Sequence, residues 1–286
     1  MSTKANNPSS LPQSKHLLCT KQNPGKIIIQ QIRNATLKIN YAGITFLIDP
    51  LLAAKGSYPG FKGTARSQLR NPLVELPLSI SDILSGVDAI IVTHTHLDHW
   101  DNAAQKYIPK HLPVFGQNHQ DVELIRSQGF TNVQILDKNS LFRNICLSPI
   151  VGQHGTESMY ANTELAKRLD QTIGVIFQAE NSKTLYIAGD TIWCDAVTQA
   201  IQDYQADIII LNTGYAQINN FAGSIIMGKD DVKRACQLTT SATVVATHME
   251  AVNHALLTRA ELRAFTEQEK INERVFIPED GEIIII

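Results

Sequence analysis

The chain alternates short runs of aliphatic and β-branched residues with stretches whose apolar positions recur at helical spacing. Such runs, bounded by Gly, Asn or Pro, predict buried strands. Three runs come early, with a turn at 40–43 between the last two, so the chain is expected to begin with antiparallel strands. Later runs alternate with helical stretches, which predicts an α/β layer. The predicted strands are 27–29, 35–39, 44–48, 87–92, 113–116, 133–136, 145–151, 173–177, 184–188, 206–211, 244–247 and 282–286.

Capping residues mark the helix boundaries. Asp101 is expected to cap one helix, Gly129 to end another, and Thr258 to form a capping box with Glu261 for the last one. Besides the last helix, which begins at 258, the predicted helices are 79–84, 102–105, 120–125, 196–201 and 229–235. Two β-rich halves with helices outside predict one α/β (or α+β) domain over 26–286, a four-layer αββα sandwich.

Composition narrows the class of protein. The 286 residues are 43% hydrophobic and 18% charged, which is typical of a globular protein, and the net charge of −2 creates no field that favours nucleic acid or an anionic membrane. Residues 1–25 are polar and lack the apolar core of a signal peptide, so they predict a mobile N-terminal arm. Four cysteines without a Cys-x-x-Cys pattern indicate reduced thiols and a cytoplasmic protein.

Candidate chemistry is concentrated after the run at 87–92. His94 and His96 are two apart on an extended segment, so both side chains leave the same face, and Asp98 and His99 follow as the chain turns. Burial of four such groups without partners is costly, which favours a metal site over packing. Imidazole and carboxylate together suit zinc, iron or manganese, and the spacing favours two metal ions.

The motif His94-x-His96-x-Asp98-His99 resembles the signature of the metallo-β-lactamase superfamily. The other motifs of that family occur in the same order, over residues 27–286. They end at Asp49, His154, Asp190 and His248. The resemblance implies an αββα fold with the metals at the shared edge of two sheets. The segments Ile48-Asp49-Pro50 and Ala188-Gly189-Asp190-Thr191 are most similar to the branch that contains L-ascorbate-6-phosphate lactonase.

The resemblance also implies a role for each position. The ligands of a first metal correspond to His94, His96 and His154, and those of a second metal to Asp98, His99 and His248. The bridging carboxylate corresponds to Asp190. The carboxylate that hydrogen-bonds a ligand histidine without binding metal itself corresponds to Asp49. Zinc is expected first, with manganese or iron as alternatives. Two cations about 3.5–4 Å apart hold a bridging hydroxide at neutral pH, so no serine or cysteine nucleophile is required.

Substrate recognition is predicted from the segment 51–74, which contains cations and no acidic residue. If it overhangs the metals, Arg66 or Arg70 is expected to bind a small anionic substrate, such as a sugar-phosphate lactone. A solvated loop or a subunit contact explains the segment equally well. Further predicted substrate contacts are Trp100, Trp193 and His254, with core packing as the alternative for both tryptophans and a structural role as the alternative for His254. Cys194 is a weaker candidate, and Asp98 is expected to handle the leaving-group proton.

Other functions stay open from the sequence. A phosphodiesterase or nuclease uses the same metal pair, but the weak net charge and the lack of a basic, aromatic-rich arm argue against nucleic acid. An oxygen-reducing diiron protein would need an electron-feeding flavin module. A non-catalytic metal-binding or scaffold protein is the alternative from another class. No run approaches the roughly 18 apolar residues of a membrane span, and a homo-oligomer is left open.

Overall fold

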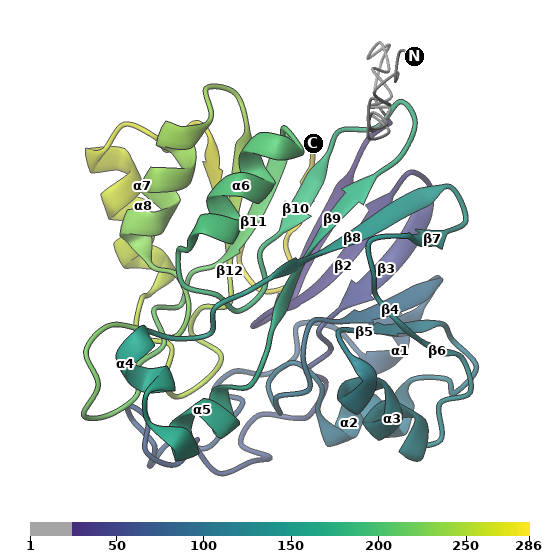
Figure 1. The fold of residues 1–286 in the computed structure, drawn as a ribbon, viewed down its shortest axis with the longest axis horizontal. Helices are drawn as coiled ribbons and strands as arrows, with labels where there is room; N and C mark the ends of the chain where they lie inside the picture. Colours follow the sequence, from purple (N-terminus) through teal and green to yellow (C-terminus); the bar gives the residue numbers. More distant parts are fainter. Residues whose placement is uncertain (1–24) are drawn as a thin grey trace, which may run out of the picture.

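The computed structural model describes residues 25–286, so nearly all of the predicted N-terminal arm lies outside the described residues. Two seven-stranded sheets face each other across the middle of the molecule (Figure 1). Antiparallel strands make up one half of the first sheet, and β3 to β6 run parallel in the other. Across that sheet the order is β14 (Ile283–Ile285), β1 (Ile28–Arg33), β2 (Thr36–Tyr41), β3 (Ile44–Ile48), β4 (Ala89–Val92), β5 (Val114–Gly116) and β6 (Val133–Ile135).

The second sheet repeats this plan. Its strands β7 to β10 are antiparallel, and β10 to β13 are parallel. Across the sheet the order is β13 (Val275–Phe276), β12 (Thr243–Thr247), β11 (Ile208–Asn212), β10 (Leu185–Ile187), β9 (Ile173–Gln178), β8 (Ile145–Val151) and β7 (Ser140–Phe142). Because parallel strands need crossover connections, each parallel half carries helices on its outer face.

Helices form the two outer layers (Figure 1). The first sheet is covered by α1 (Ile80–Leu84), α2 (Asn102–Tyr107) and α3 (His119–Ser127), and the second by α6 (Asp195–Asp203), α7 (Lys229–Leu238) and α8 (Arg259–Gln268). Capping follows the sequence: the Asp101 side chain accepts from Ala104 N, and Thr258 with Glu261 forms the capping box of α8. The predicted αββα sandwich is confirmed.

Apolar side chains from the inner faces of both sheets form the central core. Phe177 of β9 packs edge-on against Tyr41 and Phe46 of the first sheet, with ring centroids 5.6 and 5.2 Å apart. The buried Tyr41 hydroxyl donates to the carbonyls of Phe177 and Lys183, so its polar end is satisfied where the two sheets meet. These contacts fix the position of one sheet on the other, and with it the relation between their edges.

Some elements were not predicted. They are the short strands β7 and β13 and two helices, α4 (Glu157–Tyr160) and α5 (Thr163–Leu169). Figure 1 shows α4 and α5 apart from the outer helical layers, at the end of the molecule where the long connection after β3 also lies. Among residues 25–286, no helix combines the length and apolar character needed to cross a membrane.

The connection after β3 is held from beneath by Arg33. Its guanidinium is fully buried and donates to the carbonyls of Leu51, Ala53 and Val74. Burial lowers the pKa of Arg33 to about 10 against the pull of Asp101, so the side chain stays charged at neutral pH. The segment after β3 lacks the regular hydrogen bonds of a helix or sheet. A guanidinium that donates to several of its carbonyls therefore fixes its conformation.

Candidate metal centre

The residues expected to hold metals lie where strands of both sheets end. His94 to His99 follow β4, His154 follows β8, Asp190 follows β10 and His248 follows β12. The carboxyl ends of parallel strands meet at one edge of a sheet, and the packing of the two sheets brings both edges together. The structure therefore gathers side chains that are as far apart as positions 94 and 248.

One group of imidazoles surrounds an Asp190 oxygen. His94 Nε2 lies 3.0 Å from His96 Nδ1, and the Asp190 Oδ2 atom lies 3.8 Å from His154 Nε2 and 4.0 Å from His94 Nε2. Nitrogen atoms of His94, His96 and His154 all lie within 4.8 Å of one another. These separations suit three nitrogen ligands that converge on one ion.

A second group lies beside the first. His248 Nε2 is 3.5 Å from Asp98 Oδ2 and 3.2 Å from His99 Nε2, and His99 Nε2 is 3.9 Å from Asp98 Oδ2. Asp190 reaches both groups, with Oδ2 3.8 Å from His154 Nε2 of the first group and Oδ1 3.6 Å from His248 Nε2 of the second. A carboxylate with one oxygen toward each group has the geometry of a bridge between two cations.

Protonation states in this cluster favour metal binding. Burial, together with neighbouring histidines, lowers the pKa of His94 well below its ordinary value, and burial lowers that of His154 to about 4. Burial acts to raise the pKa values of Asp98 and Asp190, but the nearby imidazoles, His99 and His248 above all, together outweigh it and hold both pKa values below the usual range. Uncharged imidazoles and charged carboxylates are the forms that ligate metal ions.

His99 shows that the cluster requires positive charge. Burial acts to lower its pKa, yet the carboxylates of Asp190, Asp49 and Asp98 together raise it well above the ordinary value. Buried carboxylates without a cation thus draw a proton onto the imidazole between them. A divalent ion would supply that charge instead, so the donor set fits a metal site.

Hydrogen bonds to neighbouring polar groups orient the side chains of the cluster. Asp49 accepts from the Thr93 backbone N–H and hydroxyl, both at 2.7 Å, and its Oδ2 lies 2.8 Å from His99 Nδ1, the contact expected of this residue. Asn212 donates to Asp190 Oδ1 at 2.6 Å. Two further imidazole nitrogens face carbonyls: His154 Nδ1 lies 2.9 Å from Ile225 O and His96 Nε2 2.8 Å from Arg168 O. Such contacts fix the tautomer and ring orientation of ligand histidines.

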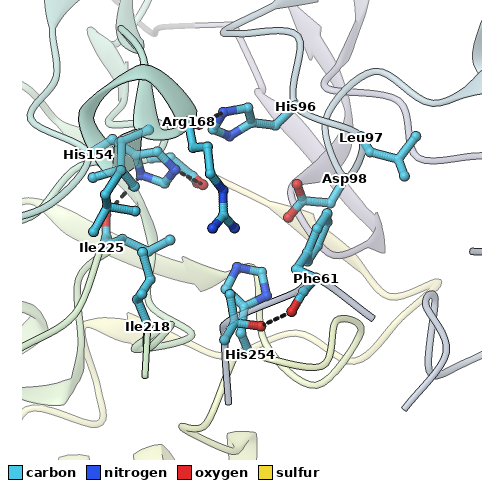
Figure 2. A pocket seen from close by; sticks show the side chains of 13 residues that line it. Phe61, His96, Leu97, Asp98, His154, Arg168, Ile218, Ile225 and His254 are labelled. Atoms are coloured by element: carbon cyan, nitrogen blue, oxygen red, sulfur yellow. Dashed lines mark hydrogen bonds and ion pairs between the residues drawn. The ribbon is translucent and has the colours of Figure 1, made fainter. Parts of the chain in front are cut away.

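A pocket opens onto the cluster, and most of its other walls are apolar (Figure 2). The loop after β3 reaches it through Phe61 and Thr64, so part of the basic segment 51–74 does border the site. Figure 2 shows the Arg168 guanidinium and the His254 imidazole directed into the same space as Asp98. Besides members of the cluster, the lining residues are Phe61, Thr64, Leu97, Leu165, Arg168, Leu169, Ile218, Ile225 and His254.

Two predicted substrate contacts, Arg66 and Arg70, lie outside this lining, and their guanidiniums bond the backbone. Arg66 donates to the carbonyls of Asn253 and Ala255. Arg70 donates to the carbonyls of Gly56 and Ser57 within its own loop. Both guanidiniums bond backbone carbonyls of the loop and its neighbour, because a long segment without strands must satisfy its carbonyls locally.

The two tryptophans also lie outside the pocket lining and pack against the outer cores, which was the alternative expected for them. Trp100 is 2% exposed in the core beneath α2 and α3, and its indole N–H donates to Gln128. Trp193 packs on the outer core of the second sheet and donates to Thr198. Cys194 is absent from the pocket lining and stands at the N-cap of α6. Of the five predicted substrate contacts, His254 alone lines the pocket.

Sequence reasoning missed the cation that does line the pocket, Arg168. It lies on α5, and its guanidinium donates to the carbonyl of Lys62 in the basic loop. The sequence does indicate this helix, because Leu165 and Leu169 are four residues apart and follow the capping residue Asn162. Nothing in that pattern indicates that the helix folds over the metal cluster.

Asn253 joins the loop after β3 to the segment that carries His254. Its side-chain oxygen accepts from Phe61 N at 2.9 Å and from Asn71 Nδ2 at 2.8 Å, and its amide donates to Thr64 Oγ1 at 2.9 Å and to Ala65 O. The residue is fully buried. One amide therefore positions two residues of the pocket wall.

Replacement Asn253→Ala is expected to release this loop and to lower the free energy of unfolding by about 3 kcal/mol, because several buried polar groups lose their partner. Trypsin should then cleave faster within 62–70, and thermal unfolding should begin earlier. The exposed Asn139→Ala serves as the control, with neither effect. Equal cleavage rates for Asn253→Ala and wild type would contradict the anchoring role.

His254 gives the protein a predicted acid sensitivity. Burial lowers its pKa from an ordinary 6.5 to about 4; Asp98 and Asp190 act against this shift, and His248 and His96 reinforce it. The unfolded chain therefore binds the extra proton between those two values, so the stability present above pH 6.5 is lost as pH falls toward 4. At pH 5 the loss amounts to about 2 kcal/mol.

In chelator-treated protein, His254→Gln should weaken this pH dependence. Denaturant unfolding at pH 7.5 and pH 5 measures the fall in free energy for wild type and variant, and the variant should fall less. The difference between two pH values cancels any constant packing effect of the substitution. Identical falls would show that His254 ionises as easily in the folded as in the unfolded chain.

Comparison with known proteins agrees with the fold and the cluster. The family described as "Beta-lactamase superfamily domain" matches residues 45–249. The UPF0173 protein YddR of Bacillus subtilis is 43% identical over 254 residues, which cover 89% of this chain and 98% of that protein. The UPF0173 metal-dependent hydrolase of Methanocaldococcus jannaschii is 25% identical over 215 residues, covering 74% of this chain and 88% of its own.

Two solved structures are similar over almost their whole length. A possible metal-dependent hydrolase from Veillonella parvula is 47% identical with a TM-score of 0.90, covering 92% of this chain and 100% of its own. An isothiocyanate hydrolase from Delia radicum gut bacteria is 46% identical with a TM-score of 0.87, covering 90% of this chain and 98% of its own.

Fold and relatives together define a metal-dependent hydrolase with a metallo-β-lactamase fold. The chain belongs to the metallo-β-lactamase superfamily and, within it, to the UPF0173 metal-dependent hydrolase family. The narrower likeness to L-ascorbate-6-phosphate lactonase is not confirmed by these relatives.

Proposed function

We propose that this protein hydrolyses small isothiocyanates, R–N=C=S, at a centre of two divalent metal ions held by the cluster around Asp190. The observation that carries the proposal is the pocket: most walls beyond the cluster are apolar, contributed by Phe61, Leu97, Leu165, Leu169, Ile218 and Ile225. An apolar R group would lose water there at little polar cost. Support also comes from the 46% identity to a protein named isothiocyanate hydrolase.

The residues divide the work between metal binding and substrate orientation. His94, His96 and His154 would hold one ion, Asp98, His99 and His248 the other, and Asp190 both. Ions bound there would lower the pKa of a shared water and so supply hydroxide at neutral pH. Zinc fits the imidazole-rich donor set best, and manganese or iron fits the carboxylates. The apolar walls direct the central carbon of the substrate toward the cluster.

The proposed reaction balances without any further reactant. Hydroxide oxygen forms a bond to the central carbon, and the C=N π pair moves to nitrogen. The hydroxide proton ends on that nitrogen, which gives the thiocarbamate R–NH–C(=S)–O⁻. Cleavage of the C–N bond with one more proton yields the amine and carbonyl sulfide. Asp98 borders the pocket and would carry the proton between oxygen and nitrogen.

A small anionic ester or lactone is the second candidate substrate, and Arg168 is the observation that favours it. This guanidinium is the cation among the residues that line the pocket, and it suits a carboxylate or phosphate on the substrate. A single cation among apolar walls satisfies a sugar phosphate poorly, because its hydroxyls would lose water without partners. We therefore place the lactone second.

Hydrolysis of a substrate panel by protein purified without chelator tests the proposal. The panel contains an aryl-alkyl isothiocyanate, a phosphorylated sugar lactone and an aryl phosphodiester, assayed with wild type and with Arg168→Gln. We expect isothiocyanate loss with both proteins, since that substrate is uncharged. Lactone hydrolysis that falls about tenfold or more in Arg168→Gln would instead favour the anionic substrate.

The adjacent Lys167→Gln serves as the control, because Lys167 lies on the same helix but pairs with Glu164 at the surface. It should leave every rate unchanged. Turnover of the phosphodiester alone would favour a phosphodiesterase, and no turnover by metal-loaded protein would favour a scaffold. A cytoplasmic location and action without nucleic acid or membrane remain part of the same proposal, and the oligomeric state stays open.

A further inference from the structure

We propose that His254 is a hydrogen-bond donor to the substrate, through Nε2–H, at the heteroatom that receives the electron pair when hydroxide attacks. This assignment rests on the proposed hydrolysis and names the residue that completes the recognition site. The cluster around Asp190 presents oxygen acceptors and metal ligands to the pocket. The negative charge that develops on the substrate during the attack is stabilised by a hydrogen-bond donor on another wall of the pocket.

Within residues 25–286, the His254 imidazole has no hydrogen-bond partner. It is 6% exposed, and its Nδ1 atom is enclosed without a partner among the described residues. The side chain borders the pocket together with Asp98 and Asp190, and Figure 2 shows it directed into the shared space. A buried polar side chain left unpaired in a pocket wall is costly for stability, which indicates a role in binding.

The enclosed position of Nδ1 decides which nitrogen carries the proton. Burial lowers the pKa of His254 to about 4, so the ring is neutral and has one N–H. A proton on Nδ1 would leave a donor buried without an acceptor, which is rarer in proteins than an acceptor without a donor. The Nε2–H tautomer therefore prevails and presents its donor to the pocket.

The segment around His254 is fixed on both sides. Gln217 N donates to the His254 carbonyl at 3.1 Å, and Arg66 donates to the carbonyls of Asn253 and Ala255. The Phe61 ring packs edge-on against the imidazole, with centroids 4.9 Å apart at 79°. An imidazole held this way keeps its donor in place before substrate arrives, so no reorganisation is required during reaction.

This donor would act on the reacting isothiocyanate without transferring its own proton. As hydroxide bonds to the central carbon, the electron pair displaced from that carbon collects on nitrogen or sulfur. A neutral N–H stabilises that charge, while the hydroxide proton moves to nitrogen as before. The imidazole ends the step as it began it.

Imidazole ¹⁵N resonances of zinc-loaded protein test the tautomer independently of turnover. His254 is assigned by its absence in His254→Gln. We expect the neutral Nε2–H pattern between pH 6 and 8, and a shift of that resonance when inorganic thiocyanate, a linear N–C–S group, is added. A Nδ1–H pattern, or an Nε2–H that does not respond to thiocyanate, would overturn the inference even if isothiocyanates are hydrolysed.

Paired substitutions test the role in catalysis. His254→Leu should lower kcat for isothiocyanate by roughly 100-fold with a much smaller change in KM, since the bond forms mainly in the transition state. His254→Gln retains an N–H at a similar reach and should recover most of that loss. Metal content and thermal unfolding are measured alongside. Equal rates for the Leu and Gln variants, with metal intact, would contradict a donor role.

These outcomes separate the inference from the proposed function. If wild type hydrolyses no isothiocyanate, the proposed function fails, yet the tautomer and the thiocyanate response still decide the state of His254. If wild type is active and His254→Leu is equally active, the function stands and the inference fails.

Discussion

Replacement of Asp190 by alanine is expected to remove most of the bound metal and to reduce hydrolysis by roughly 1000-fold or more. The carboxylate reaches both halves of the cluster, with Oδ2 3.8 Å from His154 Nε2 and Oδ1 3.6 Å from His248 Nε2. Without it, two cations would face each other across a buried space with less negative charge between them. Their mutual repulsion in that surrounding is strong.

Metal analysis of protein purified without chelator measures the first effect. About two equivalents of metal per chain are expected in wild type and well under one in Asp190→Ala. The variant Asp190→Asn keeps an oxygen that can accept from Asn212, so it preserves that contact while it removes the charge. The exposed Asp203→Ala is the control for loss of a surface carboxylate. A folded wild type without metal would contradict the dinuclear centre and favour a scaffold.

Replacement of Gly214 by alanine is expected to displace His248 and to lower the free energy of unfolding by about 3 kcal/mol. An added Cβ would lie 2.2 Å from the His248 carbonyl oxygen and 2.9 Å from Ala255 Cβ. Both neighbours are held: Gly214 O accepts from Leu256 N and Leu257 N, and Thr213 N donates to Thr247 O beside His248, so the backbones cannot separate without loss of these bonds. The crowding acts on a ligand of the second proposed metal.

Thermal unfolding and metal content together test this prediction. The melting temperature should fall by roughly 10 °C, and the metal content should drop toward one equivalent. Gly25→Ala is the matched control, since a Cβ there meets nothing within 4 Å and its backbone is unstrained. A Gly214→Ala protein with unchanged melting and two metals would show that this close approach relaxes easily.

The candidate metal ligands could be predicted because short sequence motifs identify them. Six positions after one strand contain four potential ligands, from His94 to His99, and the remaining ligands stand alone at strand ends in the family order. Side-chain chemistry and spacing are both properties of the chain. The structure brings all seven candidates together, with the Asp49 carboxylate beside them.

The pocket walls could not be predicted in the same way. Arg66 and Arg70 have the charge expected of anion-binding residues, but their side chains bond backbone carbonyls. Arg168 has no distinguishing neighbour in the sequence, and it borders the pocket because α5 packs over the site. The charge of a side chain shows that it could bind an anionic substrate. Whether that side chain points into the pocket depends on how its loop or short helix packs in the folded protein.

Sequence alone determined the alternation of strands and helices, the four-layer class of fold and the candidate ligands, since hydrophobic period and ligand chemistry are encoded residue by residue. Tertiary structure decided which side chains face the pocket. Packing of α5 and of the loop after β3 against the strand ends turned Arg168, Phe61 and His254 inward and Arg66 toward the backbone. These contacts join residues as far apart as 61 and 254 in the chain. A pattern within a short stretch of sequence cannot predict such a contact.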